Sequence, residues 1–374
     1  MKNIIIVTFI NSYNYGAFLQ AKATEMIISK TGLKPRFLNY CNKEEQNQRK
    51  LFCYSAKFSV LYNLKRFAWK LWFGYYHGEI RNGKKNFQGA IDNLPKTKKY
   101  NRLSDIEKNE RIDLLICGSD QIWNPDIFNA KIDPIYYGKI KNAKSKISFA
   151  SSFGSYEPNK QQLETLKDYF CDFDAISVRE GFAKKNLKKI GVEMPIDIVL
   201  DPTLCITAKE WRVVSKNNDK FNIIQKNAYM VIYLVNPKVK CQGLIDYVSK
   251  VLNLKTIWIK NNDLKSFQVD EIVTNATPYD FVNLISNAKF VLTDSFHGTA
   301  FAINLNIDFV SIINQNNPER VMHLCTELGL LDRLSKEDDA ECNVTIIDYT
   351  CINEKLSELR EKSIQWILNR VERY

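Results

Sequence analysis

The chain contains a series of short, continuous apolar runs, and these constrain its fold more than any other feature. Examples are Ile4–Val7, the stretch 114–117 within Ile112–Cys117, and Phe290–Leu292. The runs do not alternate apolar with polar residues, which indicates strands that are buried on both faces, as in a parallel sheet covered by helices. Segments with helical spacing separate the runs, so the sequence predicts an α/β fold.

The predicted elements form two groups along the 374 residues, a length that suits two domains with a core each. The expected strands are Asn3–Phe9, Lys34–Tyr40, Ile112–Cys117, Lys146–Ala150, Asp174–Val178 and Ile196–Leu200, then Tyr229–Val235, Lys255–Ile259, Phe290–Thr293 and Asp308–Ile313. The expected helices are Tyr15–Ser29, Asn159–Phe170, Gly181–Lys189, Val239–Leu252, Tyr279–Asn287, Thr299–Leu305, Glu319–Leu328 and Asn353–Val371. We predict two Rossmann-like, doubly wound domains facing a cleft, residues 1–202 and 203–350, followed by a C-terminal helix over residues 351–374.

The composition excludes several classes of protein. The nine cysteines form no CxxC pair and have no regular spacing, which favours reduced core residues of a cytosolic protein over disulfides or a zinc site. With only three histidines, a histidine-rich metal site is not expected, and we predict neither a metal nor a cofactor. No apolar run has the length of a membrane span or the layout of a signal peptide.

The basic charge is concentrated in one insertion, residues 43–100. It holds 13 Lys/Arg and 4 Asp/Glu, a net charge of +9 out of +11 for the chain, beside many aromatic residues. Within it, the polar residues of Phe58–Tyr76 fall at helical spacing, which favours an interfacial helix on anionic lipid. The alternative is a helix packed on the N-terminal domain with solvated lysines. A single-stranded nucleic acid is a third partner for such a stretch, but no nucleic-acid fold signature accompanies it, so none is predicted.

One histidine lies in a setting that suits chemistry. His297 follows the apolar run Phe290–Leu292 within Asp294-Ser-Phe-His-Gly298, before the helix expected at Thr299. Ligands of open α/β sheets bind at this junction of strand and helix, and a helix N-terminus attracts anions. A histidine exchanges protons near neutral pH. The alternative is a histidine that only caps the turn.

Four polar turns and one Asp-Pro motif occur together in a specific order. They are Asn14-Tyr-Gly16-Ala-Phe-Leu-Gln20, Gly118-Ser-Asp-Gln-Ile-Trp-Asn124, Ser177-Val-Arg179-Glu180, Leu200-Asp-Pro-Thr203 and Asp294-Ser-Phe-His-Gly298. Together they resemble the polysaccharide pyruvyl transferase family, from the first turn to Leu330-Leu-Asp-Arg333. The resemblance implies a two-domain GT-B-like fold. It also implies phosphoenolpyruvate as co-substrate, and a pyruvate ketal built on two hydroxyls of a sugar in a cell-surface glycan.

The resemblance also assigns site residues. The family histidine falls on His297, the expected catalytic residue, and one family arginine falls on Arg179. A second arginine of some members, two residues before the histidine, is Ser295 here, and we expect Arg320 to replace that cation by position. With Gly298, these residues are the expected donor-binding set.

The chemistry of the residues agrees with this assignment. The donor carries a carboxylate and a phosphate, both of which arginine binds through paired hydrogen bonds. Ketal formation needs a group that gives and takes a proton, which His297 supplies. Asn14, Gln20 and Asp120 are candidates to bind or orient the acceptor. Each of these residues also has a structural alternative. Asn14 can serve the turn, Gln20 can lie on a helix face, and Asp120 can cap a helix. The alternative for Arg179 is a surface salt bridge with Glu180 or another neighbour.

Three functions follow from these features. The first is a cytoplasmic pyruvyl transferase that acts on a lipid-linked sugar, peripheral on the inner face of the membrane. The second is a GT-B glycosyltransferase that uses a nucleotide sugar, for which Glu319 is a candidate ribose ligand. The third is a non-catalytic member of a glycan assembly complex. This alternative rests on Ser295, which stands where some family members have a donor-binding arginine. The sequence makes no prediction of oligomeric state.

Overall fold

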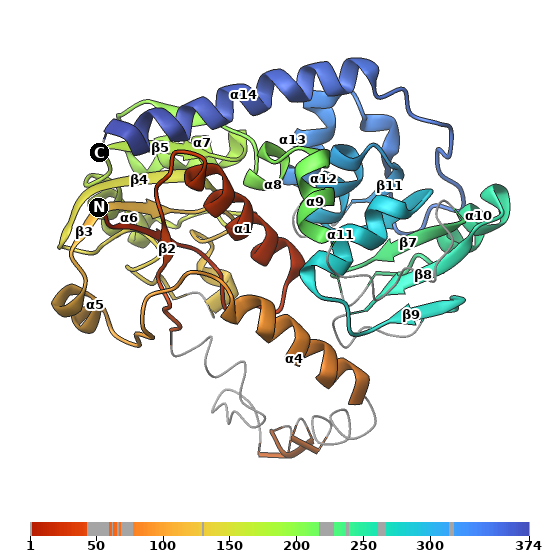
Figure 1. Cartoon of the computed structure of the whole chain (residues 1–374), viewed down its shortest axis with the longest axis horizontal. Helices are drawn as coiled ribbons and strands as arrows, with labels where there is room; N and C mark the ends of the chain where they lie inside the picture. The colour runs from red at the N-terminus through yellow and green to blue at the C-terminus, as the bar shows by residue number, and fades with distance from the viewer. Residues whose placement is uncertain are drawn as a thin grey trace.

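A computed structural model of the chain contains two parallel sheets, each of six strands, with helices around them (Figure 1). The structure describes residues 2–42, 60–61, 63–65, 67–68, 78–128, 131–216, 228–236, 239–260, 267–313 and 318–373. The two α/β halves predicted from the apolar runs are thereby confirmed.

The N-terminal sheet has the strand order β2-β1-β3-β4-β5-β6, and all of its neighbouring strands are parallel. Its strands are β1 (Ile4–Val7), β2 (Arg36–Phe37), β3 (Ile112–Cys117), β4 (Ala143–Ser151), β5 (Ala175–Val178) and β6 (Ile196–Ile198). Its helices are α1 (Tyr15–Ser29), α4 (Gly78–Asp92), α5 (Leu103–Asn109), α6 (Lys160–Phe170) and α7 (Gly181–Ile190). The central strands are largely buried, and runs such as Ile4–Val7 of β1 and 114–117 of β3 are apolar without alternation for that reason.

The C-terminal sheet has the order β12-β11-β10-β7-β8-β9, also parallel throughout. Its strands are β7 (Tyr229–Tyr233), β8 (Lys255–Ile259), β9 (Glu271–Val273), β10 (Phe290–Thr293), β11 (Asp308–Ile312) and β12 (Leu334–Ser335). Its helices are α10 (Gln242–Leu252), α11 (Pro278–Asn287), α12 (Phe296–Leu305) and α13 (Glu319–Leu328).

Three further helices join the halves: α8 (Pro202–Cys205), α9 (Ala208–Ser215) and the long α14 (Thr350–Arg373). Figure 1 shows α14 running along one side of both halves. It is fastened to the N-terminal half where Ser363 Oγ accepts a hydrogen bond from the Leu200 N–H at 2.9 Å and Trp366 stacks on Phe149. The domain limits predicted at residues 202 and 350 stay an interpretation.

The strand orders explain where a ligand site should lie. In the N-terminal sheet the order reverses between β1 and β3, and in the C-terminal sheet between β7 and β10. Ligands of open α/β sheets bind beyond the carboxyl ends of the strands at such switch points. The turns after β3 and β10 are two of those that the sequence singled out.

Several predicted element limits need correction. Helix α12 begins at Phe296 and not at Thr299, because Ser295 caps it, so His297 and Gly298 belong to its first turn. The sequence prediction missed the short elements β9, β12, α5, α8 and α9, which lack long apolar runs. Helix α4 was also missed, since it lies in the insertion.

The insertion is described only in part. Most of the helix expected over Phe58–Tyr76 lies outside the described residues, although residues 60–61, 63–65 and 67–68 are helical. Helix α4 lies in the last part of the insertion and packs closely on the C-terminal half. A Cβ on Gly83 of this helix would lie 2.2 Å from the Thr274 carbonyl oxygen, so only a glycine permits the contact. Among the described residues, no helix has the length and apolarity to cross a membrane.

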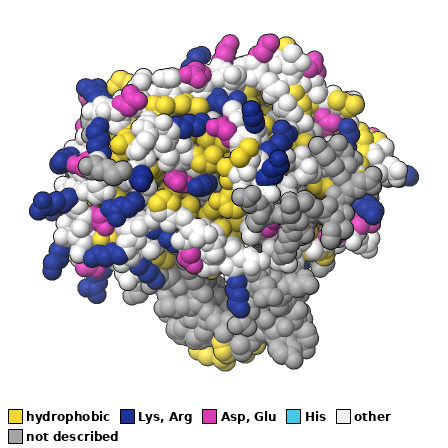
Figure 2. Space-filling model, viewed as in Figure 1, with side chains coloured by type: hydrophobic (Ala, Val, Ile, Leu, Met, Phe, Trp, Pro, Cys, Tyr) yellow, Lys and Arg dark blue, Asp and Glu magenta, His cyan; other side chains and the backbone are white. Residues whose placement is uncertain are grey.

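Lysine and arginine side chains are numerous on the N-terminal half. Figure 2 shows them over the left of the molecule, with aspartate and glutamate side chains among them. On this face the mixing of both signs is that of an ordinary solvated surface.

Candidate active site

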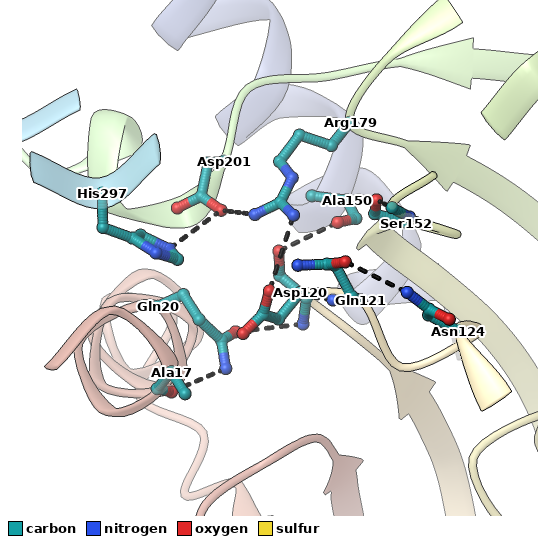
Figure 3. A network of polar contacts seen from close by, with 12 residues as sticks. Ala17, Gln20, Asp120, Gln121, Asn124, Ala150, Ser152, Arg179, Asp201 and His297 are labelled. Atoms are coloured by element: carbon teal, nitrogen blue, oxygen red, sulfur yellow. Dashed lines mark hydrogen bonds and ion pairs between the residues drawn. The ribbon is translucent and has the colours of Figure 1, made fainter. Parts of the chain in front are cut away.

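His297 lies on the first turn of α12, where the C-terminal half faces the N-terminal half. Strand β10 ends at Thr293, and the Ser295 side chain accepts a hydrogen bond from the Gly298 N–H, which starts the helix. The imidazole is only 6% exposed. It points toward α1 and toward Asp201, as Figure 3 shows.

Gly16, the second residue of α1, makes room for the imidazole. A Cβ at this position would lie 1.9 Å from His297 Nδ1 and 2.2 Å from Cγ, far inside van der Waals contact. Only a glycine therefore permits this approach, and the first turn of α1 forms one wall of the histidine site. Asn14 starts that helix, since its side chain accepts from the Ala17 N–H at 3.1 Å.

Asp201 is the residue that connects His297 to the N-terminal half. One carboxylate oxygen accepts from the Thr203 N–H at 2.9 Å and so caps α8. The other lies 2.5 Å from Arg179 Nη1 and 3.7 Å from His297 Nε2. Burial raises the pKa of Asp201, but the neighbouring His297 and Arg179 side chains and the hydrogen bonds from Thr203 outweigh it and hold the pKa well below its ordinary value.

Arg179 follows β5 and is surrounded by carboxylates. Its side chain is 3% exposed, and besides Asp201 it lies 3.5 Å from Asp120 Oδ1 and 3.6 Å from Glu180 Oε2. The surface salt bridge considered from the sequence is thus a buried cluster, in which removal of one partner leaves an unpaired charge. Burial lowers the pKa of Arg179, but its three carboxylate neighbours outweigh that and raise it.

Phe296 contacts two arginines. Arg179 Cζ is 4.7 Å from the ring centroid and Arg320 Cζ is 5.4 Å away, both within cation–π range. Arg320 lies on the first turn of α13 and is half-buried. Burial, reinforced by the charge of Arg179, lowers the pKa of Arg320 to about 10. The structure thus brings together Arg179, Arg320 and the residue next to His297.

A cavity of about 250 Å³ adjoins these arginines between β6, α13 and α14. Its basic side chains are Arg179, Arg320, His323 and Lys362, and its acidic ones are Glu180, Asp201 and Glu327. Aliphatic residues, including Leu204 and Leu359, complete the wall. A small anion with an apolar part fits such a lining, because charge and hydrocarbon are both matched.

Other residues that the sequence singled out have structural contacts. Gln20 is fully buried, donates to Thr8 Oγ1 at 2.8 Å and accepts from the Ser119 N–H at 3.2 Å, so it ties α1 to the ends of β1 and β3. Gly298 allows α12 to pack on its strand, because a Cβ there would lie 2.3 Å from Thr293 Oγ1.

Asp120 lies next to Arg179 and caps no helix. Its backbone has a φ of 73°, in the left-handed region, and its side chain accepts from the Gln121 N–H at 2.8 Å. Asp201 and Glu180 were not predicted as site residues. The Leu200-Asp-Pro-Thr203 motif carried the signal for Asp201, since an Asp before Pro and Thr is typical of a helix N-cap.

The fold and this site define a class: a two-domain α/β protein with a buried His–Asp–Arg cluster between the domains. A family model described as polysaccharide pyruvyl transferase matches residues 14–316. The chain belongs to that family, and it is therefore a transferase. The predicted family resemblance is confirmed. A search of curated proteins gave no match.

Solved structures with a similar fold include sugar-nucleotide enzymes. UDP-GlcNAc 2-epimerase from Methanocaldococcus jannaschii is 15% identical over 100% of both chains, with a TM-score of 0.54. The Rickettsia bellii UDP-N-acetylglucosamine 2-epimerase is 14% identical over 100% of this chain and 97% of its own, with a TM-score of 0.50. The glycosyltransferase SnogD from Streptomyces nogalater is 12% identical over 97% and 94%, with a TM-score of 0.44. The two epimerases support the predicted fold of two Rossmann-like, GT-B-like domains.

Proposed function

We propose that the protein transfers the pyruvyl group of phosphoenolpyruvate to two hydroxyls of a sugar, forming a ketal in the biosynthesis of a cell-surface polysaccharide. The observation that carries this proposal is the position of His297. Its imidazole lies beside the Asp201–Arg179 ion pair, where the two domains meet and a cavity with basic side chains adjoins. Family membership supports the same reaction.

The side chains of the cavity suit the donor. Phosphoenolpyruvate carries a carboxylate and a phosphate on a small apolar carbon frame. Arg179 and Arg320 supply two guanidinium groups, and His323 and Lys362 add further positive charge or hydrogen-bond donors at the wall. Arginine binds both anionic groups through paired hydrogen bonds.

His297 can carry the proton transfers of this reaction. The protonated imidazole gives a proton to C3 of the donor, which becomes a methyl group, and then takes the proton of the first sugar hydroxyl as that oxygen bonds to C2. The C2–O bond to phosphate breaks, and the second hydroxyl bonds to C2. Of the two hydroxyl protons, one replaces the proton given to the methyl group and the other leaves with phosphate. Asp201 lies beside the imidazole, with its carboxylate oxygen 3.7 Å from Nε2, and so holds the ring in position.

The acceptor belongs to the same proposal. We expect a lipid-linked sugar, held at the inner face of the membrane, with Asp120 or Asn14 near its hydroxyls. Asp120 is adjacent to Arg179, and Asn14 starts the helix beside His297. The basic residues Arg66 and Lys70, expected to dock the insertion on anionic lipid, lie outside the described residues.

Ligand binding and turnover test the proposal separately. Phosphoenolpyruvate should raise the melting temperature, whereas a panel of nucleotide sugars should not. Phosphate release from the donor should require a sugar acceptor, taken from a panel of nitrophenyl hexosides and lipid-linked sugars. His297→Ala should abolish this release and keep the donor-induced shift.

Two outcomes would overturn the proposal. Stabilisation by a nucleotide sugar and not by phosphoenolpyruvate would favour the glycosyltransferase alternative, for which Glu319 is exposed at the start of α13. Unchanged turnover in a folded His297→Ala variant would remove this histidine from the mechanism.

A further inference from the structure

The buried charges around Arg179 are not balanced for an anionic ligand. Arg179 and Arg320 supply two positive charges, and Asp120, Glu180 and Asp201 supply three negative charges when ionised. A ligand with a carboxylate and a phosphate would add more negative charge to a poorly solvated site, where like charges repel several times more strongly than in water. Binding of such a ligand therefore favours the neutral form of one of the three carboxylates.

Glu180 is arranged differently from the other two carboxylates. It occupies the N-cap position of α7, but its side chain accepts no hydrogen bond from the first turn of that helix. Instead it turns toward β4, where Ser152 Oγ donates to Oε1 at 2.7 Å, and toward Arg179 and the cavity. A helix start would prefer Ser, Asp or Asn at this position, so capping does not account for a glutamate here.

The two oxygens of Glu180 have different surroundings. The single proton of the Ser152 hydroxyl is committed to Oε1, because the same hydroxyl accepts from the Gly154 N–H at 2.8 Å. Oε2 is buried and has no hydrogen-bond partner among the described residues, although it lies 3.6 Å from Arg179 Nε. The side chain is 1% exposed. A proton added to this carboxyl would reside on Oε2, and the Arg179 guanidinium would then be released from Glu180.

We propose that Glu180 takes up a proton when an anion binds in the cavity beside Arg179 and Arg320, and that it thereby decides whether the site admits a multiply charged donor. Proton uptake removes one of the three carboxylate charges and frees one side of the Arg179 guanidinium. For phosphoenolpyruvate as the anion, this inference rests on the proposed function. Glu180 is a positioning residue in this role, since it acts on the donor through Arg179.

The directions of the pKa shifts support Glu180, rather than Asp201, as the group that takes up the proton. Burial raises the pKa of Glu180, against the opposing effects of Arg179, Ser152, Arg320 and His323. The pKa of Asp201 is shifted in the opposite direction. The charged and titratable groups that face Glu180 or its cavity are Arg179, Arg320, His323, Lys362, Asp201 and Glu327.

The test is the pH dependence of ligand affinity in wild type and Glu180→Gln. Affinity for phosphoenolpyruvate, and for inorganic phosphate as a second probe, is measured by calorimetry at about pH 8–9, above the second ionisation of both phosphate groups. Uptake of one proton makes the wild-type dissociation constant rise about tenfold for each pH unit above the pKa of Glu180. Glutamine resembles the protonated carboxyl, so Glu180→Gln should bind as tightly as wild type at low pH and lose this tenfold slope.

Two variants serve as controls. Glu327→Gln removes a carboxylate from the same cavity that does not contact Arg179, and it should keep the wild-type slope. Ser152→Ala removes the hydrogen bond that favours the ionised form of Glu180, so its slope should begin at a higher pH.

Stability provides a readout without ligand. Because the folded-state pKa of Glu180 is raised, the folded protein binds this proton more tightly than the unfolded chain, and stability is lost as pH rises through the folded pKa. Glu180→Gln should therefore melt above wild type at high pH and lose that advantage in acid. Equal differences at every pH would overturn the inference.

The outcomes separate this inference from the proposed function. If inorganic phosphate shows the Glu180-dependent slope and phosphoenolpyruvate does not bind, the proton linkage stands and the proposed donor is wrong. If phosphoenolpyruvate binds with the same slope in wild type and Glu180→Gln, the donor stands and the linkage is wrong. If neither anion binds, both proposals fail.

Discussion

A methyl group at Gly16 should displace the proposed catalytic histidine without removing any polar group from the site. In the Gly16→Ala variant the new Cβ would lie 1.9 Å from Nδ1, 2.2 Å from Cγ and 2.6 Å from Cε1 of His297. These distances are well below the usual 3.5–4.0 Å or so between non-bonded heavy atoms. The imidazole must therefore move by about 1 Å or more. This movement breaks the 3.7 Å contact between His297 Nε2 and Asp201 Oδ2.

Helix position supplies a matched control for the size of the effect. Gly243 is the second residue of α10, as Gly16 is of α1, and a Cβ there would meet nothing within 4 Å. Gly243→Ala should therefore stabilise the protein by about 0.5–1 kcal/mol through helix propensity alone. Gly16→Ala should lose about 1–3 kcal/mol, as overpacked cores do. The two variants should therefore differ by about 1.5–4 kcal/mol in the free energy of unfolding.

Urea unfolding and turnover measure the two parts of this prediction. A displacement of about 1 Å at a catalytic group lowers the rate by about 100-fold, so Gly16→Ala should lose activity by at least that factor while Gly243→Ala keeps it. If Gly16→Ala gains stability like its control and retains wild-type turnover, the imidazole does not lie against α1, and the geometry described for His297 is wrong.

Three further predictions concern the arginines and metal ions. Arg179→Ala should lower the free energy of unfolding by about 3–5 kcal/mol in urea titrations, because it leaves buried carboxylates unpaired, whereas Arg320→Ala, at a half-buried site, should weaken donor binding with a much smaller loss of stability. Ser295→Arg should restore donor affinity, measured by calorimetry, in the Arg320→Ala background, at a cost of about 1 kcal/mol for the lost cap; no recovery would show that Arg320 does not replace the family cation. Turnover should persist in EDTA, since the described residues contain no cluster of three or more His, Cys, Asp and Glu side chains suited to a metal; a loss that a divalent ion restores would favour a metal-dependent glycosyltransferase.

The architecture could be predicted from the sequence because burial on both faces leaves a direct trace in it. The strands Ile112–Cys117 and Phe290–Thr293 contain consecutive apolar positions, 114–117 and 290–292, and the structure pairs both strands within parallel sheets. Short edge strands leave no such trace. Strand β9 is mostly exposed, and β12 has two residues, so tertiary pairing defines them and local sequence does not.

The start of α12 was misplaced for a related reason. Gly298 suggested a break in the chain, and the helix was expected to follow it. In the structure Gly298 is helical, because its missing side chain lets the first turn pack on Thr293, and Ser295 supplies the cap. A glycine near a helix end does not reveal whether backbone freedom or close packing requires it.

Residue types at the site could be predicted, but their ionic partners could not. Arg179 and Asp120 lie 59 positions apart in the chain, and only the order of β3, β4 and β5 in the sheet brings the turn after β3 to the turn after β5. The sequence therefore suggested an arginine free to bind an anion, whereas the structure places three carboxylates around it.

The position of Phe296 connects this cluster to the departure at Ser295. Its ring contacts both Arg179 and Arg320, so two cations adjoin the residue between Ser295 and His297. The expectation that Arg320 replaces the arginine of other family members at position 295 would place this guanidinium on the neighbouring helix α13. Because an aromatic face holds a guanidinium by its plane, Phe296 orients both arginines. The site can thus keep its charge while one of its cations changes its position in the sequence.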